Sequence, residues 1–302
     1  MRVLLTGATG FVGSHMLERL VTDGHEVRVL ARDPMKLDPP PGPGRMAAVH
    51  GDVVTGRGID EACAGCDAAI HLVGIIVEAG GATFEKTHHV GTTNVLKAAK
   101  RARIRRFVQM SALGARADGV SRYQTTKWKA EEAVRASDMD WVILRPSIIF
   151  GPRDGFVTQM LAVMHSAPLF RPVVGHGKYP FRPVYIGDVV ECFAQSLTSR
   201  EVVGQTIELV GRDELTLDQL LALVAQCAGI RKPSMHIPFP LMYANATILG
   251  KILKRPPVTT DQLRMLQEGS TADPERMKHI FHVEPLGFRE GLTRYVCAAA
   301  AR

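Results

Sequence analysis

The 302-residue sequence predicts an α/β fold, with a doubly wound parallel sheet and a smaller, mainly helical C-terminal substrate domain. Strand and helix signals alternate through the first half of the chain, which is typical of parallel sheets covered by helices. This alternation weakens from about Gly151, where glycine and proline interrupt the pattern. We therefore expect residues 1–150 to form the sheet domain, with 182–210 returning to it. Residues 151–181 and 211–302 are expected to form the smaller domain.

Short apolar runs that are rich in branched or aromatic residues predict the strands of the sheet. In the first half these runs are Val3–Leu5, Val27–Leu30, Ala68–Val73, Phe107–Met110 and Trp141–Leu144. Segments with apolar residues at helical spacing lie between the runs. Because strands that alternate with helices pair in parallel through right-handed crossovers, this order predicts a doubly wound sheet.

Turn and cap residues mark the remaining elements. The tract Asp38–Gly44 is rich in proline and glycine, so it predicts a surface loop after the second strand. A strand is expected at Thr206–Val210. Thr216 precedes apolar residues at helical spacing from Leu217 to Val224, so we expect its side chain to cap a helix. Residues 230–302 are expected to be mostly helical.

The chain is basic, with a net charge of +7 and a pI of about 9.3. Such a surface suits an anionic ligand, a nucleic acid or an acidic membrane, and charge alone does not choose among them. The densest basic cluster, within residues 100–106, ends a predicted helix, where cations complement the negative helix terminus. No aromatic residues for base stacking are interleaved with it, so we expect no nucleic-acid partner.

The five cysteines show no spacing typical of a disulfide framework. Cys63 and Cys66 form a C-x-x-C pair, but neither a second pair nor a histidine cluster accompanies them, so no metal site is expected. The chain begins with a strand pattern and has no apolar stretch of ~18 residues, so we expect neither a signal peptide nor a membrane-spanning helix. These features favour a reducing cytoplasm.

A glycine-rich turn joins the first predicted strand to the first predicted helix, with the sequence Thr6-Gly7-Ala8-Thr9-Gly10-Phe11-Val12-Gly13. Gly7 suits a tight turn, Gly10 lets a pyrophosphate approach the backbone, and Gly13 lets the helix pack against the sheet. The helix start then offers free N–H groups and a partial positive charge to the phosphates. This context predicts a Rossmann-type dinucleotide site that includes Thr9, Phe11 and Val12.

The end of the second strand indicates which dinucleotide binds. An acidic residue there would bind both ribose hydroxyls of NAD, whereas a basic residue would pair with the 2′-phosphate of NADP. Arg32 follows this strand, and Asp33 precedes a proline and is expected to shape the turn. Because guanidinium geometry suits phosphate, we expect NADPH or NADP as the cofactor, with NAD less favoured.

Tyr123 and Lys127 lie four residues apart at the start of a predicted helix, so both fall on one helical face. An ammonium group near the phenol would favour the phenolate and lower the pKa of Tyr123. Tyr123 could then act as an acid or base toward a carbonyl or hydroxyl group beside the nicotinamide. Lys127 could also hydrogen-bond the nicotinamide ribose.

Several segments together resemble the atypical and extended short-chain dehydrogenase/reductases, which include epimerase- and dehydratase-like proteins. The similarity is strongest to a branch that contains the NADPH-binding accessory subunit of respiratory complex I and its bacterial homologues. The matching segments are Thr6–Gly13, Arg106–Ala115, Ser121–Tyr123, Leu144–Pro152, Arg182–Val189 and Val258–Leu266. The resemblance implies NADP(H) binding and leaves turnover open, because function does not follow from fold alone.

The resemblance also implies roles for individual residues. Asp52 would contact the adenine beside Val53, and Leu72, Val73 and Gly74 would lie against the cofactor. Ser111 would orient the substrate oxygen, although the usual active serine would fall at Leu113. His88 stands where many extended members have an asparagine, or it is a helix-start residue bonded to its neighbours. Pro146 and Ile148 would line the nicotinamide side, and Tyr185 and Asp188 would lie between the domains.

Three functions remain open from the sequence. The first is an oxidoreductase on a carbonyl or hydroxyl group of a lipid-like or quinone-like substrate, with Tyr123 as acid or base. The second is a non-catalytic NADPH-binding accessory or sensor module of a larger or membrane-associated assembly. The third is a nucleotide-sugar epimerase or dehydratase, which the short loop from Ser111 to Tyr123 disfavours. The apolar stretch 238–255 either covers the pocket or lies on a membrane surface, which would make the protein peripheral to the inner membrane.

Overall fold

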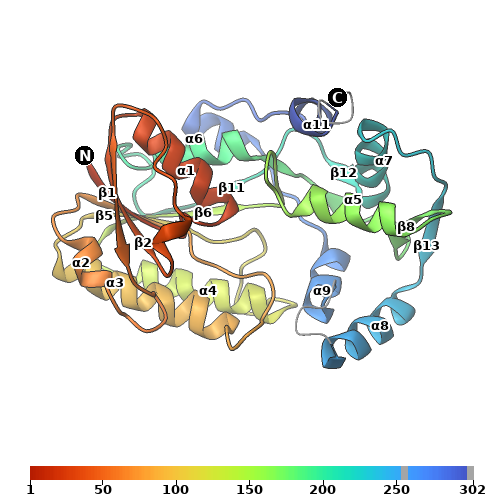
Figure 1. The fold of residues 1–302 in the computed structure, drawn as a ribbon, viewed down its shortest axis with the longest axis horizontal. Coiled ribbons are helices and arrows are strands. Elements are labelled where there is room, and N and C mark those ends of the chain that lie inside the picture. Colours follow the sequence, from red (N-terminus) through yellow and green to blue (C-terminus); the bar gives the residue numbers. More distant parts are fainter. Residues whose placement is uncertain (253–257, 298–302) are drawn as a thin grey trace.

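The computed structural model describes residues 1–252 and 258–297, and it has the predicted α/β architecture (Figure 1). Seven strands form one parallel sheet in the order β11-β6-β5-β4-β1-β2-β3. Their bounds are β1 (Arg2–Thr6), β2 (Glu26–Ala31), β3 (Arg45–His50), β4 (Ala68–His71), β5 (Arg106–Met110), β6 (Asp140–Pro146) and β11 (Gln205–Leu209). The expectation of a doubly wound sheet is confirmed.

Helices cover both faces of this sheet (Figure 1). On one face α1 (Phe11–Thr22) packs against α6 (Ile186–Gln195), because Met16, Leu20, Val189 and Phe193 share one buried cluster with the sheet. The other face carries α2 (Ile59–Cys63), α3 (Gly91–Arg101) and α4 (Arg122–Arg135). The tract from Asp38 to Gly44 forms no helix or strand, as predicted.

The strand order reverses at β1, which lies between β2 and β4. The loops that leave β1 and β4 therefore diverge to opposite sides at the carboxyl edge of the sheet, and this is where open α/β sheets form the crevice that binds their ligands. The glycine-rich turn after β1 and the segment Leu72–Gly74 after β4 both lie at this edge.

The smaller lobe combines helices with short strand pairs. Its buried cluster includes Phe150, Phe181, Leu220, Val224 and Phe288. The helices are α5 (Phe156–Ser166), α7 (Leu217–Cys227), α8 (Phe239–Ile252), α9 (Thr260–Glu268) and α11 (Phe288–Leu292). The short strands are β8 (Arg171–Val174) with β13 (Ser234–Ile237), and β9 (Pro180–Phe181) with β12 (Leu215–Thr216).

A few connecting elements complete the fold. The strands β7 (Ile149–Phe150) and β10 (Val184–Tyr185) pair in parallel, and α10 (Glu275–Phe281) packs against β11. Short helices occur at η1 (Pro34–Lys36), η2 (Glu85–Val90) and η3 (Thr293–Cys297).

The predicted cap of α7 is confirmed. The Thr216 hydroxyl accepts a hydrogen bond from the Gln219 N–H, and the Gln219 side chain accepts one from the Thr216 N–H. The same reciprocal arrangement begins α4, where Ser121 and Gln124 cap the helix that carries Tyr123. Such caps satisfy N–H groups that have no partner within the helix.

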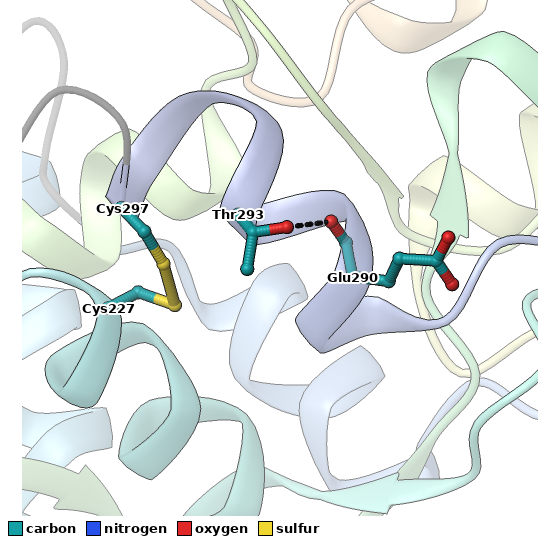
Figure 2. Close-up of a disulfide and its surroundings, with 4 residues drawn as sticks. All are labelled: Cys227, Glu290, Thr293 and Cys297. Atoms are coloured by element: carbon teal, nitrogen blue, oxygen red, sulfur yellow. Dashed lines mark hydrogen bonds between the residues drawn. A yellow bond between two sulfur atoms is a disulfide. The ribbon is translucent and has the colours of Figure 1, made fainter.

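The expectation about cysteines was wrong for one pair. Cys227 at the end of α7 and Cys297 in η3 form a disulfide across 70 residues of sequence (Figure 2). Their Cα atoms lie 4.6 Å apart, and no local spacing rule reveals a pairing over such a distance. Cys63, Cys66 and Cys192 are free and buried.

The described part of the chain contains neither a cluster of metal ligands nor a membrane-spanning helix. Among those residues, no group of three or more His, Cys, Asp or Glu side chains could hold a metal ion. None of the helices there is long and apolar enough to cross a membrane.

Candidate active site

The glycine-rich turn has the geometry that a pyrophosphate requires. Gly7 has a φ of +81°, which glycine adopts without strain. A Cβ added to Gly13 would lie 2.0 Å from the Gly7 carbonyl oxygen, so the helix approaches the turn closely only because Gly13 has no side chain. Gly10 is the N-cap of α1 and provides no side-chain cap.

The start of α1 leaves donors available for an anion. The Ser14 N–H bonds to the Gly10 carbonyl oxygen at 2.9 Å, so the N–H groups of the preceding helical residues have no acceptor within the helix. The twelve residues of α1 add a partial positive charge at this end. Thr9 is exposed beside the turn, Phe11 is half-buried, and Val12 packs inward against the sheet. The residues present therefore fit a dinucleotide pyrophosphate.

Arg32 follows β2 and is exposed. Its side chain makes no hydrogen bond or ion pair with any residue that the structure describes. Asp33 instead precedes the short helix η1, without a side-chain capping bond, and its carboxylate pairs with Lys36 at 3.5 Å. Asp52 accepts a hydrogen bond from the Val54 N–H at 2.8 Å and shapes the turn after β3. Val53 is buried, and its carbonyl accepts a hydrogen bond from Asn94 in α3.

The segment after β4 contacts the helix that carries the predicted acid. Leu72 is buried and donates its N–H to the Thr6 carbonyl, which ties the segment to β1. A Cβ at Gly74 would lie 3.0 Å from the Lys127 Nζ and 3.6 Å from the His88 Nε2. Lys127 and His88 therefore converge on Gly74, next to the half-buried Val73.

Tyr123 lies in a small aromatic cluster at the start of α4. Its ring meets the His88 ring edge-on, with centroids 5.3 Å apart, and meets the buried Phe84 ring at 5.8 Å. Phe84 and His88 stack on each other at 5.4 Å. These contacts hold the phenol ring in one orientation, because edge-to-face aromatic pairs are favourable and directional.

The predicted effect of Lys127 on Tyr123 was wrong in direction. Burial raises the pKa of Tyr123 to about 12 instead of lowering it, because the apolar surroundings disfavour the phenolate. Burial also lowers the pKa of Lys127 to about 8, against a smaller opposing effect of Glu131. The Lys127 Nζ donates a hydrogen bond to the Met110 carbonyl oxygen at 3.1 Å, which places the amine at the end of β5.

His88 joins three segments of the site. Its Nδ1 lies 3.0 Å from the Thr126 hydroxyl in α4, and its Nε2 lies 3.0 Å from the Ile75 carbonyl oxygen after β4. Burial and the nearby Lys127 lower the pKa of His88 to about 2, so the imidazole is neutral at physiological pH. The bonds of His88 to Thr126 and Ile75 give it a positioning role between the two segments.

Ser111 follows β5 and is buried, and its hydroxyl has no hydrogen-bond partner among the described residues. Such an unpaired buried hydroxyl fits a ligand oxygen in this crevice. Leu113 bonds through its N–H to the Pro146 carbonyl at 2.9 Å, so this loop runs beside the end of β6. Pro146 is buried, and Ile148 is half-buried against the core of the smaller lobe.

The two interdomain residues contact both lobes. Tyr185 packs on Phe150 at 5.6 Å and lies under the Arg294 guanidinium at 5.4 Å. Asp188 accepts a hydrogen bond from the Leu286 N–H at 2.8 Å.

Sequence reasoning missed several residues of the site. His71 at the end of β4 is fully buried, and its Nδ1 lies 2.6 Å from the Thr6 hydroxyl. A histidine that ends an otherwise apolar strand was the available signal for this contact. Glu268, at the end of α9, bonds the Gln124 side chain and pairs with Arg116. No local pattern reveals that contact, because 144 residues separate Glu268 from Gln124.

The fold and this crevice together define a Rossmann-type nicotinamide-dinucleotide-binding protein. A family model described as NAD(P)H-binding matches residues 7–160. The chain belongs to this family, within the epimerase- and dehydratase-like short-chain dehydrogenase/reductases.

Named relatives include enzymes and a respiratory subunit. The chain is 32% identical over 243 residues to the ceramide reductase of Caulobacter vibrioides, which covers 79% of this chain and 74% of that protein. It is 29% identical to subunit 9 of the NADH dehydrogenase 1 alpha subcomplex of Arabidopsis thaliana, over 80% of this chain and 61% of that subunit. The UDP-glucuronic acid 4-epimerase from Bacillus cereus, solved with NAD, shares the fold with a TM-score of 0.75 and 16% identity over 99% of this chain and 100% of that one.

Proposed function

We propose that this protein is an NADP(H)-dependent reductase that acts on the carbonyl group of a lipid-like or quinone-like substrate. The preference for NADP(H) over NAD(H) is inferred from the exposed Arg32 side chain at the end of β2. This side chain has no partner among the described residues. A guanidinium in this position suits a 2′-phosphate, and no carboxylate directly follows the strand to bind the ribose hydroxyls.

The chain's own residues provide the groups for proton transfer. NADPH, when bound, supplies the hydride for such a reduction. Tyr123 remains protonated at neutral pH because burial raises the pKa of its phenol, so it can donate a proton to a developing alkoxide. Lys127, with a pKa of about 8, can hold or release a proton close to physiological pH. His88 and Phe84 orient the Tyr123 ring.

Two observations support an apolar substrate. Leu113 and Ile76 add apolar surface after β5 and β4, and the Ile76 side chain is 62% exposed. A relative with 32% identity is named as a ceramide reductase.

The test measures NADPH oxidation with a panel of long-chain ketones, quinones and UDP-sugars, using the wild type and Tyr123→Phe. The proposal expects turnover with an apolar carbonyl compound and a loss of at least about 100-fold in Tyr123→Phe, with NADPH binding unchanged. Chromatography of the UDP-sugar reactions detects epimerisation, and a converted UDP-sugar without net NADPH oxidation would instead support an epimerase.

A second candidate is a non-catalytic NADPH-binding module within a larger assembly. The specific observation in its favour is Leu113, which brings no hydroxyl to the position that the resemblance assigns to an active serine. Tight NADPH binding, with no turnover of any compound in the panel, would support this candidate and overturn the reductase.

A further inference from the structure

Two segments of the sequence, which include β8, β13 and α8, are rich in Lys and Arg. The segments 155–187 and 219–260 contain eight Lys and Arg residues and no Asp or Glu. The rest of the chain has 29 Lys and Arg against 30 Asp and Glu, so these two segments account for the positive charge of the whole protein. Lys254, Arg255 and the side chain of Lys251, which contribute to this count, lie outside what the structure describes, and Arg182 pairs with Glu214 at 3.1 Å.

Apolar side chains gather in the same segments. Of the six most exposed large apolar residues that the structure describes, four are Leu169, Leu241, Ile248 and Ile252, with 58–79% of their surface exposed. Met235 in β13 is also exposed. The paired strands β8 and β13, and α8 some way from them, lie at the end of the molecule away from β1 and β2 (Figure 1). Monomeric proteins rarely leave apolar side chains gathered in this way without a binding role.

Helix α8 presents two different faces. One face is held in the fold, because Ala246 is buried and the Tyr243 hydroxyl donates a hydrogen bond to Gln267 of α9 at 2.9 Å. The other face carries Leu241, Ile248 and Ile252, which follow one another by seven and four residues and so share one side of the helix. No described residue covers that side.

We propose that this end of the molecule docks on the surface of an anionic lipid bilayer. We define the docking face as Leu169, Met235, Leu241, Ile248, Ile252, Lys178 and Arg231. An amphipathic surface binds an interface through buried apolar area together with attraction to anionic lipids. The Lys178 and Arg231 side chains are exposed and have no hydrogen-bond or ion-pair partner among the described residues, so both are free to meet lipid phosphates.

The charge distribution favours a bilayer over a protein partner as the occupant. Cations without intervening carboxylates suit a uniformly anionic surface, and each basic residue near such a surface adds to binding. One carboxylate lies among these elements: Asp218 of α7 accepts a hydrogen bond from His236 of β13 at 3.0 Å, and the unpaired Lys178 and Arg231 outnumber it.

Docking at α8 would bring the bilayer close to the candidate active site. Helix α9 packs against α8, and its last residue, Glu268, bonds to Gln124 beside Tyr123. One helix thus separates the docking face from the start of the helix that carries the phenol. This inference does not require catalysis, so the vesicle test and the NADPH oxidation test can fail independently.

The test is co-sedimentation of the full chain with vesicles of phosphatidylglycerol and phosphatidylcholine, and with phosphatidylcholine alone. We expect binding only to the anionic vesicles, and weaker binding at high salt, where charges are screened. The double variants Lys178→Glu/Arg231→Glu and Leu241→Gln/Ile248→Gln should each weaken binding by about tenfold or more.

Matched controls separate docking from general charge effects. Lys97→Glu/Arg200→Glu changes the net charge equally on the sheet domain, and Met35→Gln removes an exposed apolar side chain there; each should change binding by less than about twofold. With Trp128 and Trp141 replaced by Phe, a single tryptophan at Ile248→Trp should show a blue-shifted emission on anionic vesicles, whereas one at Val203→Trp should not. The proposal is overturned if anionic vesicles do not bind, if the controls weaken binding as much as the face variants, or if Leu241→Gln/Ile248→Gln instead dissociates a dimer.

Discussion

At the scale of single residues, Lys127 makes stability depend on pH. Its pKa is 10.5 in the unfolded chain and about 8 in the fold, because burial disfavours the ammonium. Below pH 8 the amine is charged in both states, so its burial cost is fully present. Between about pH 8 and 10.5 the unfolded state binds more protons, so stability rises with pH. Over this whole pH range the free energy of unfolding rises by roughly 3 kcal/mol.

We therefore expect Lys127→Met to raise the free energy of unfolding, relative to wild type, by more at pH 7 than at pH 10. Urea unfolding at both pH values measures this difference in the free energy of unfolding. Lys97→Met, an exposed lysine on α3, serves as the control and should show no such pH dependence. A difference for Lys127→Met that is independent of pH would mean that the buried amine does not lose its proton in this range.

Arg32 gives a second residue-scale prediction. Charge-assisted hydrogen bonds to phosphate contribute about 1.5–3 kcal/mol, so Arg32→Ala should raise the Kd for NADPH by about 10- to 100-fold. The Kd for NADH should change little, because NADH has no 2′-phosphate. Isothermal titration calorimetry with NADPH and with NADH measures the two Kd values in the wild type and in the variant. Arg45→Ala, on the neighbouring strand β3, is a matched control. Equal weakening of both nucleotides would contradict the assigned role.

At the scale of elements, the contact between α1 and the turn before it depends on Gly13. A Cβ there would lie 2.0 Å from the Gly7 carbonyl oxygen and 2.6 Å from the Gly7 carbonyl carbon. Both atoms belong to the backbone, so only a shift of the helix or the turn relieves the contact. We expect Gly13→Ala to lower the free energy of unfolding by about 2 kcal/mol or more.

The same variant should also bind NADPH at least about tenfold more weakly, since the helix start moves away from the phosphates. Gly155→Ala is the matched control, because a Cβ there meets nothing within 4 Å. Thermal unfolding with and without NADPH reports both effects. A Gly13→Ala protein with unchanged stability would show that the turn is looser than its distances indicate.

The elements also show what sequence reasoning can reach. The turn of Gly7, Gly10 and Gly13 and the cap at Thr216 were predictable, because each depends on residues within one or two helical turns. The pKa of Tyr123 was not, since its direction depends on how deeply the ring is buried and not on the spacing to Lys127. A spacing of four residues places two side chains on one face of a helix, but it does not show how far either side chain is exposed to solvent.

At the scale of the whole molecule, the contacts that were missed join distant segments. Glu268 reaches Gln124 and Arg116 from the smaller lobe, and Arg294 stacks on Tyr185 near the lobe boundary. Local periodicity carries no information about such pairs, because only the arrangement of the two lobes brings them together. The parallel, doubly wound character of the sheet was predictable, because alternation and handedness imply it without any long-range contact, whereas the strand order was not predicted.

The Cys227–Cys297 disulfide is a covalent link between distant segments, and from it we predict how the stability of the smaller lobe depends on reduction. It ties the end of α7 to η3 and closes a segment of 70 residues that includes α8 and α9 (Figure 2). Closing a loop of this size restricts the unfolded chain, which typically stabilises the fold by about 2–4 kcal/mol. Reduction of the wild type should therefore lower the free energy of unfolding by that amount.

Cys227→Ser and Cys297→Ser should each reproduce this loss, and the double variant should lose no more, since both replacements remove the same bond. Thiol titration of the denatured protein provides the direct measurement: three reactive thiols before reduction, from Cys63, Cys66 and Cys192, and five afterwards. Five thiols before reduction would show that the pair is open in solution. A reducing compartment would favour that open form, so the link would then stabilise the lobe around α8 only under oxidising conditions.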